Sequence, residues 1–361
     1  MTTPLLYIAG MGMITPLGPN VATTVAAINA GISAYTLSEY ETADGEPITI
    51  AKVPDALFNN IDAVIDEGDR FNLRHDRLTK MAILAVREAC SMHVIEQTIP
   101  VVLGMSEQKV DKEGLGSFIK NLQENCKPWI SAQLSRSIYS GRAVGMEAID
   151  FVFRYLSELT YPFILVGASD SYMDDELINP LAQEHRLLTP GVSDAFAPGE
   201  AASFLLLTRH IELAENRNGF AIAIHPPGIA KEEGHLYSDV PYRGDGLDQS
   251  FKKVLTRQSE KSICKIYSSM NGENHWAKEY GVAYLRNKQK FSDNFSIEHP
   301  ADCYGDIGSA TASTLITLAA ENLHKNKNGK THLVYSSSDS SIRGAVLVEK
   351  ICLNNAMELK V

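Results

Sequence analysis

The stretch that decides the fold stands near the N-terminus and reads Ile8-Ala9-Gly10-Met11-Gly12-Met13-Ile14-Thr15-Pro16-Leu17-Gly18. The apolar run at residues 5–9 predicts a buried strand, and the glycines after it predict a tight turn. The Gly10-x-Gly12 pair is not a dinucleotide-binding fingerprint, because the third glycine at the required spacing is missing and a proline follows. We therefore expect no nucleotide cofactor at this turn.

Composition places the chain among ordinary globular proteins. It has 361 residues, of which 44% are hydrophobic and 21% charged. The formal net charge of -11 argues against partners such as nucleic acid or an anionic membrane. We find no apolar stretch of bilayer length and no signal peptide, so membrane insertion is not expected. The five cysteines are widely spaced and form no Cys-x-x-Cys motif, which favours the cytoplasm and disfavours a zinc site.

Short apolar runs alternate with helical periodicity twice along the chain. We predict strands at 100–103, 163–167, 202–207, 220–224, 262–267, 332–336 and 345–348. We predict helices at 21–30, 77–92, 141–159, 247–255, 276–287 and 307–323. This alternation indicates an α/β protein whose sheets are covered on both faces. Turn residues at 216–219 mark a seam, so we predict two similar halves, residues 1–218 and 219–361.

Five later segments stand in a fixed order behind residues 8–18. They are Ser140-Gly141 with Ala148-Ile149, Val166-Gly167-Ala168-Ser169-Asp170-Ser171, Leu187-Leu188-Thr189, Phe196-Ala197-Pro198-Gly199-Glu200-Ala201-Ala202, and Gly305-Asp306-Ile307-Gly308-Ser309-Ala310. As an ordered set, they make the chain resemble the β-ketoacyl synthase branch of the thiolase fold. The resemblance implies a five-layer α-β-α-β-α arrangement of two similar halves. It also implies a dimer that pairs through the strand leading to the nucleophile turn.

The chain departs from that family where its chemistry takes place. Ketosynthase chemistry needs a thiolate nucleophile, two imidazoles and a pair of backbone N–H donors. Ile138 aligns with the cysteine, and the two histidine positions fall on Asn271 and Asp306. The usual lysine aligns with Ala301, and Ser337–Arg343 replaces a glycine-rich loop. Isoleucine has no lone pair and forms no thioester, so these departures indicate a protein without the family's reaction.

Three residues near these positions are candidates for relocated chemistry. Ser140 is a possible serine nucleophile, Cys303 a possible relocated thiol, and His275 a possible substitute imidazole. We interpret Ser140 as a small packing residue of the turn, because no histidine is identified as its base. Free cysteines are usually small buried hydrophobes, which is our interpretation of Cys303. We interpret His275 as a surface residue at a helix start.

Other polar residues are given structural roles. Asn271, Glu273 and Asp306 are predicted to form a polar cluster, because the two family histidines converge on one pocket. We favour a water-filled or hydrogen-bonded structural cluster over an acid/base pair. The charged run at 74–77 is interpreted as a solvated face or capping turn. Tyr139 is interpreted as a packing residue.

The favoured function is a catalytically inactive β-ketoacyl synthase-like protein that acts by binding or dimerisation. Such a role resembles a chain-length-factor subunit or a protein adaptor, without metal or cofactor. The expected partner is a second copy or an active ketosynthase; an acyl carrier protein or an effector protein is a further candidate. Two alternatives stay open: an acyltransferase or decarboxylase with a relocated nucleophile, and an adaptor for a secretion-system effector.

Overall fold

The computed structural model describes residues 4–65, 73–107, 115–155, 161–256, 258–260, 262–326 and 330–353. The N-terminal elements are β1 (Leu6–Ile14), α1 (Val21–Asn29), β2 (Thr36–Glu41), β3 (Pro47–Ile50), α2 (Leu73–Cys90), β4 (Val101–Met105), α3 (Leu115–Asn125), β5 (Arg136–Tyr139), α4 (Val144–Tyr155), β6 (Ile164–Ser171), α5 (Asp175–Gln183) and β7 (Glu200–Thr208). The later elements are β8 (Phe220–Ile224), β9 (Gly228–Lys231), α6 (Asp245–Leu255), β10 (Ile263–Ser268), α7 (Asn274–Asn287), β11 (Phe291–Glu298), α8 (Ala301–Tyr304), α9 (Thr311–Lys325), β12 (Thr331–Ser337) and β13 (Ile342–Cys352).

One strand order occurs twice in the large sheet. In the first half, β1 pairs antiparallel with β7, β7 antiparallel with β6, and β4 pairs parallel with both β6 and β5. In the second half, β8, β13, β12, β10 and β11 follow each other with the same sequence of pairing senses. β1 joins the two sets by pairing antiparallel with β8. The halves are therefore similar in topology, while the boundary at 218/219 stays a prediction.

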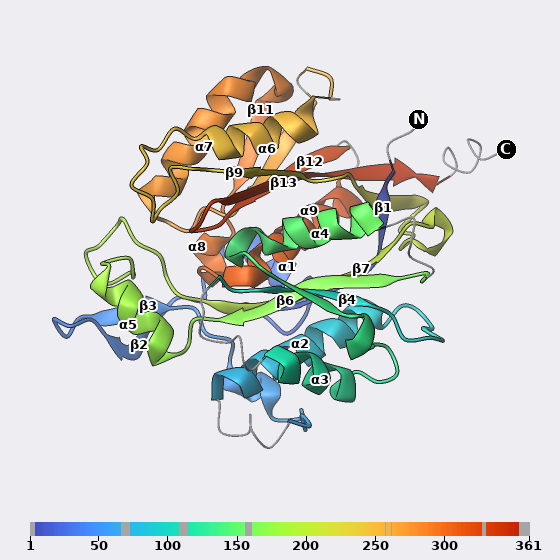
Figure 1. The fold of residues 1–361 in the computed structure, drawn as a ribbon, viewed down its shortest axis with the longest axis horizontal. Coiled ribbons are helices and arrows are strands. Elements are labelled where there is room, and N and C mark those ends of the chain that lie inside the picture. The colour runs from blue at the N-terminus through green and yellow to red at the C-terminus, as the bar shows by residue number, and fades with distance from the viewer. Residues whose placement is uncertain are drawn as a thin grey trace.

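The elements stack in five layers, as Figure 1 shows. α2 and α3 cover one outer face, α6 and α7 cover the other, and α4 and α9 lie between the two sets of strands. β6 and β7 are buried along their whole length. α9 is buried at most positions and is rich in Ala, Ser and Thr, as a helix between two sheets requires. The predicted α-β-α-β-α arrangement is confirmed.

The predicted turn at the N-terminal glycines is wrong, because β1 runs straight through them to Ile14. The glycines serve a close approach of α2 instead. A Cβ at Gly10 would lie 2.1 Å from the carbonyl oxygen of Ala89, and one at Gly12 would lie 2.0 Å from that of Ala85. Only residues without a side chain allow the helix to pack directly on this strand.

The charged run at 74–77 is not a solvated turn, which corrects its interpretation. α2 begins at Leu73, four residues before the predicted start, and the run lies inside it. Arg74 is buried and donates to Asp170 (3.0 Å). Arg77 donates from Nε to both oxygens of the buried Glu200, at 2.8 and 2.7 Å. The run therefore ties α2 to β6 and β7.

The sequence did not predict the hairpin of β2 and β3, which forms a separate two-stranded sheet packed against α5. Strands β9 and β11 and helices α3 and α5 were also missed. Among the residues that the structure describes, no helix is long and apolar enough to cross a membrane.

We expect Gly12→Ala to destabilise the protein by about 3 kcal/mol, the upper end of overpacking costs, because the new methyl group meets backbone rather than a movable side chain. Gly281→Ala is the matched control. Gly281 lies inside α7 with no atom within 4 Å of an added Cβ, so alanine should stabilise by about 0.5–1 kcal/mol. Urea unfolding of both variants measures the difference. Equal stabilities would contradict direct packing of α2 on β1.

Candidate functional site

The turn between β5 and α4 carries no cysteine. Ile138 lies within β5, opposite Gly104 of β4, and its side chain packs against the core between the sheets. The chain turns two residues after β5 ends, where Gly141 adopts a φ of 62° before a short 3-10 turn, Gly141–Ala143, leads into α4. Glycine adopts this backbone conformation without steric cost. The alignment of Ile138 with the family cysteine stays a prediction, and the residue at the turn itself has no side chain.

The polar residues predicted to cluster do meet behind this turn. Asn271 Nδ2 lies 2.8 Å from Asp306 Oδ2 and 3.0 Å from Glu273 Oε2. All three side chains are buried. Asn271 follows the end of β10, and Asp306 precedes the 3-10 turn that opens α9. The cluster is larger than the sequence indicated, because two arginines complete it.

Arg142 and Arg186 close the cluster into a ring. Arg186 binds Glu273 through two contacts, Nε to Oε1 at 2.7 Å and Nη2 to Oε2 at 2.9 Å. Its Nη1 donates to Asp339 Oδ2 at 2.8 Å. Arg142 donates to the other oxygen of Asp339 and to Asp306. We call this closed set the ionic ring; its members, in order, are Arg142, Asp306, Asn271, Glu273, Arg186 and Asp339.

Trp276 supports the ionic ring from α7. Its Nε1 donates to Glu273 Oε2 at 2.9 Å, and its aromatic ring faces the guanidinium of Arg142 at 4.4 Å. A cation over an indole face is attracted by the negative charge density of the ring. Both arginines are thereby fixed by several groups at once.

The ionic ring holds its charges. Burial raises the pKa of Asp339, but Arg142 and Arg186 outweigh it and hold that pKa below its ordinary value. Burial likewise opposes ionisation of Glu273, and its contacts with Arg186 lower its pKa overall. The pKa of Arg142 is raised, because its carboxylate neighbours outweigh the effect of burial. Groups so strongly ionised and paired are poor proton donors or acceptors at neutral pH.

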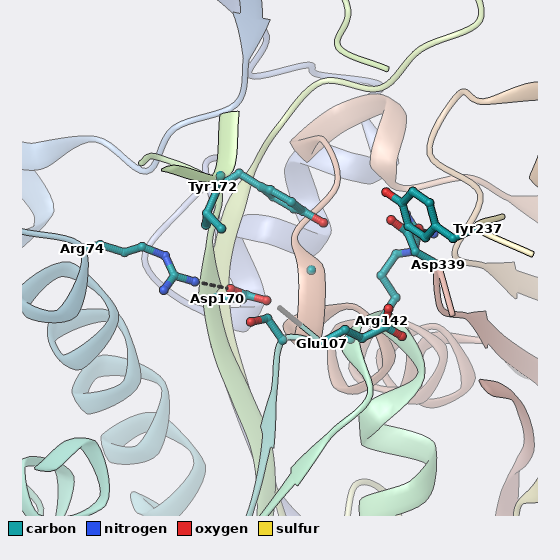
Figure 2. A pocket seen from close by; sticks show the side chains of 11 residues that line it. Arg74, Glu107, Arg142, Asp170, Tyr172, Tyr237 and Asp339 are labelled. Atoms are coloured by element: carbon teal, nitrogen blue, oxygen red, sulfur yellow. Dashed lines mark hydrogen bonds and ion pairs between the residues drawn. The ribbon is translucent and has the colours of Figure 1, made fainter. Parts of the chain in front are cut away.

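A small cavity of about 80 Å³ lies beside the turn. Gly141, Arg142 and Asp339 line one side of it, and Tyr172 extends its ring into the same space (Figure 2). Clefts that bind drug-sized ligands occupy several hundred Å³. This cavity is therefore suited to a small ligand or a few water molecules rather than to a long acyl chain.

The segment predicted to replace the family's glycine-rich loop lies over the turn. We call residues 338–341, between β12 and β13, the strap. The hydroxyl of Ser338 donates to the carbonyl of Ser140 and accepts from Ala143 N at 3.0 Å. Ser340 donates to Glu107 from its backbone N at 3.1 Å and from its hydroxyl at 2.6 Å. These contacts close the turn from the side of the second half.

The three candidates for relocated chemistry come from three different elements, Ser140 before α4, Cys303 on α8 and His275 on α7. Ser140 is buried, and its Oγ has no hydrogen-bond partner among the described residues. Cys303 lies on α8, and burial, with Asp302 and Glu298, raises the pKa of its thiol. A thiol with a raised pKa is a weak nucleophile at neutral pH.

His275 lies at a helix start, as interpreted, but it is half-buried rather than fully exposed. It is the second residue of α7, and its ring lies 5.0 Å from that of Tyr242 and 4.7 Å from that of Trp276. Burial lowers its pKa. Tyr139, interpreted as packing, is 44% exposed.

Sequence reasoning missed both arginines and Trp276. Neither arginine belongs to a motif, whereas Asp339 stands in a segment that the sequence had marked as replaced. Within the described part of the chain, no group of His, Cys, Asp and Glu side chains is arranged to hold a metal ion.

No protein-family model and no curated protein matches this chain. Solved structures do. The ishigamide ketosynthase/chain length factor superposes with a TM-score of 0.73 at 15% identity, covering 96% of this chain and 99% of that one. The ketosynthase ApeO with its chain length factor ApeC, from Xenorhabdus doucetiae, gives 0.68 at 14%, covering 96% and 98%. AntDE:AntF, a type II acyl-carrier protein with its hexaketide-bound ketosynthase, gives 0.73 at 14%, covering 96% and 99%. The chain thus has the thiolase fold of these proteins.

We expect Arg142→Met to cost about 3–5 kcal/mol of stability, because it leaves Asp306 and Asp339 buried without their shared cation. Arg154→Met, in the helix that follows Arg142, is the control. Arg154 is 70% exposed and pairs with Asp150, so its loss should cost less than about 1 kcal/mol. Denaturant unfolding at pH 7 measures both. Similar costs for the two variants would contradict a structural role for the ionic ring.

The stabilities of the wild type and of Arg142→Met should depend differently on pH in acid. The folded-state pKa of Asp339 lies below its unfolded value of about 4, so its carboxylate stabilises the fold above that pH. This stabilisation is lost as the pH falls through the folded-state value. In Arg142→Met the pKa of Asp339 should rise, and less stability is left to lose. A wild-type stability that does not fall more steeply than that of Arg142→Met between pH 5 and 2 would contradict this.

Proposed function

We propose that this protein is a catalytically inactive relative of the ketosynthases that acts by associating with a ketosynthase-type partner, as a chain length factor does. The observation that carries the proposal is the ionic ring. It fills the region behind the β5–α4 turn with mutually bonded side chains, four of which are held in their charged form by their neighbours. A condensing enzyme needs a thiolate and imidazoles in that region.

The charges of the ionic ring support binding over catalysis. An acyl transfer develops negative charge during the reaction and needs donors that are free to receive it. The donors of Arg142 are instead engaged by Asp306, Asp339 and the carbonyl oxygen of Ser337. Releasing the donor that Asp306 accepts would leave a fully buried carboxylate without its cation, which is strongly unfavourable.

The association itself is supported by β5. This strand forms one edge of the large sheet, and within the described residues it pairs only with β4. Edge strands present unpaired backbone groups that template pairing with another chain. Ile138 is half-buried and Tyr139 is largely exposed, so apolar surface accompanies the open edge. We propose that a second copy or a ketosynthase pairs here.

The absence of covalent chemistry is tested by intact-mass measurement. After incubation with malonyl- and acyl-thioesters, the protein should show no stoichiometric mass gain, because Ser140 has no base and the thiol of Cys303 is protonated. Ile138→Cys should not gain condensing activity, because the imidazoles are still missing. Cys303→Ala shows whether any acyl group is carried by that thiol. One acyl group per chain, lost with Cys303→Ala or mapped to Ser140, would support the relocated nucleophile and refute this proposal.

The proposed interface at the edge of β5 is tested by placing a charged side chain on it. Tyr139→Lys should weaken self-association, or association with a co-expressed ketosynthase, by about tenfold or more, because a lysine on an edge strand opposes pairing. Leu285→Lys is the matched control, since Leu285 is 66% exposed on α7, on the opposite outer layer. Sedimentation velocity measures both variants. A monomeric wild type that also fails to bind the ketosynthase, or equal effects of the two lysines, would contradict the proposed interface.

A further inference from the structure

Asp339 is held in the way that proteins hold a free carboxylate. Arg142 donates to its Oδ1 and Arg186 to its Oδ2, so each oxygen of this carboxylate accepts from a different guanidinium. Arginine is favoured for carboxylate recognition because its donors are rigid and permanently charged. The side chains of both arginines are buried, with exposures of 4% and 8%.

The carboxylate and its receptors belong to different parts of the fold. The arginines lie at the start of α4 and in the segment after α5, in the first half of the chain. Asp339 comes from the strap, which is neither helix nor strand, and its side chain is 21% exposed. Asp339 therefore reaches buried receptors from the solvent side.

The two receptors do not depend on Asp339 alone. Arg142 keeps its contact with Asp306, and Arg186 keeps its double contact with Glu273. Asn271 links those two carboxylates from behind. Without the Asp339 carboxylate, one donor of each arginine would be free while both guanidiniums stayed in place.

Space for another carboxylate lies alongside. The cavity of about 80 Å³ is lined by both Arg142 and Asp339, and Figure 2 shows them together at one end of it. Tyr237, which accepts from Arg186 Nη1 at 2.6 Å, also lines the cavity. The volume admits formate or acetate but not an aromatic acid.

We infer that Arg142 and Arg186 form a binding site for small carboxylates, that Asp339 is its tethered ligand, and that the strap is the device that closes it. Opening the strap exchanges the Asp339 carboxylate for one from solution at the same two guanidiniums. The contacts of Ser338 with Ser140 and of Ser340 with Glu107 set how firmly the strap is closed. This inference stands whether or not the chain pairs with a ketosynthase.

The test removes the tethered ligand. Asp339→Ala should show a saturable rise in melting temperature with sodium acetate or formate, on the order of 2 °C. Sodium chloride at equal ionic strength and sodium benzoate should give no comparable rise. Wild type should respond at least tenfold more weakly, because Asp339 competes from within the chain. Asp339→Asn should respond less than Asp339→Ala, because the amide still fills the space.

A second variant keeps the ionic ring intact. Ser340→Ala removes one hydrogen bond of the strap and leaves Asp339 and the ionic ring in place. This variant therefore tests the site even if Asp339→Ala does not fold. It should bind acetate more tightly than wild type does. An acetate response no larger than that to chloride in both variants would overturn the site. A wild type that responds as strongly as Asp339→Ala would overturn the tethered ligand. Neither result bears on mass gain or association, so the proposed function is tested separately.

Discussion

The guanidinium of Arg142 is the constraint on which the arrangement of this molecule depends. It is buried at the start of α4, between two sheets, where an unpaired charge is not tolerated. It therefore needs acceptors within the fold, and its hydrogen-bond acceptors all lie in the second half of the chain: Asp306, Asp339 and the carbonyl of Ser337. Satisfying one cation fixes the two halves against each other and seals the turn that precedes it.

In the proposed function, the ionic ring and condensation chemistry exclude each other in the same volume. Catalysis requires groups whose interactions strengthen as charge develops in the transition state. The ionic ring does the opposite, because its strongest contacts already exist in the resting protein and each member is bonded to its neighbours. Such a site contributes rigidity and shape. The exposed edge of β5 then becomes the feature through which a rigid shape can act on a partner.

Sequence reasoning worked where a pattern is local or ordered, and failed where pairing is distant. β6 and β7 overlap the mainly apolar runs 163–167 and 202–207, so their burial was predictable, and the ordered motifs indicated the five layers. The cluster of Asn271, Glu273 and Asp306 followed from two aligned positions. The roles of Arg142 and Arg186 could not be predicted, because the sequence does not distinguish a buried arginine from an exposed one. Arg142 finds Asp306 and Asp339 at sequence separations of 164 and 197.

The repeated topology explains why carboxylates gather at this junction. α4 and α9 each follow the edge strand of their half, and each begins with a 3-10 turn opened by a glycine of positive φ, 62° at Gly141 and 55° at Gly308. In each 3-10 turn, a backbone N–H is bound by a side chain from the other half. Ser338 of the second half accepts from Ala143 N, and Asp170 of the first half accepts from Ser309 N at 2.8 Å. Two helix N-termini at one junction favour anions. Anions collected there need cations that do not lose their charge, and arginine meets that need where histidine does not.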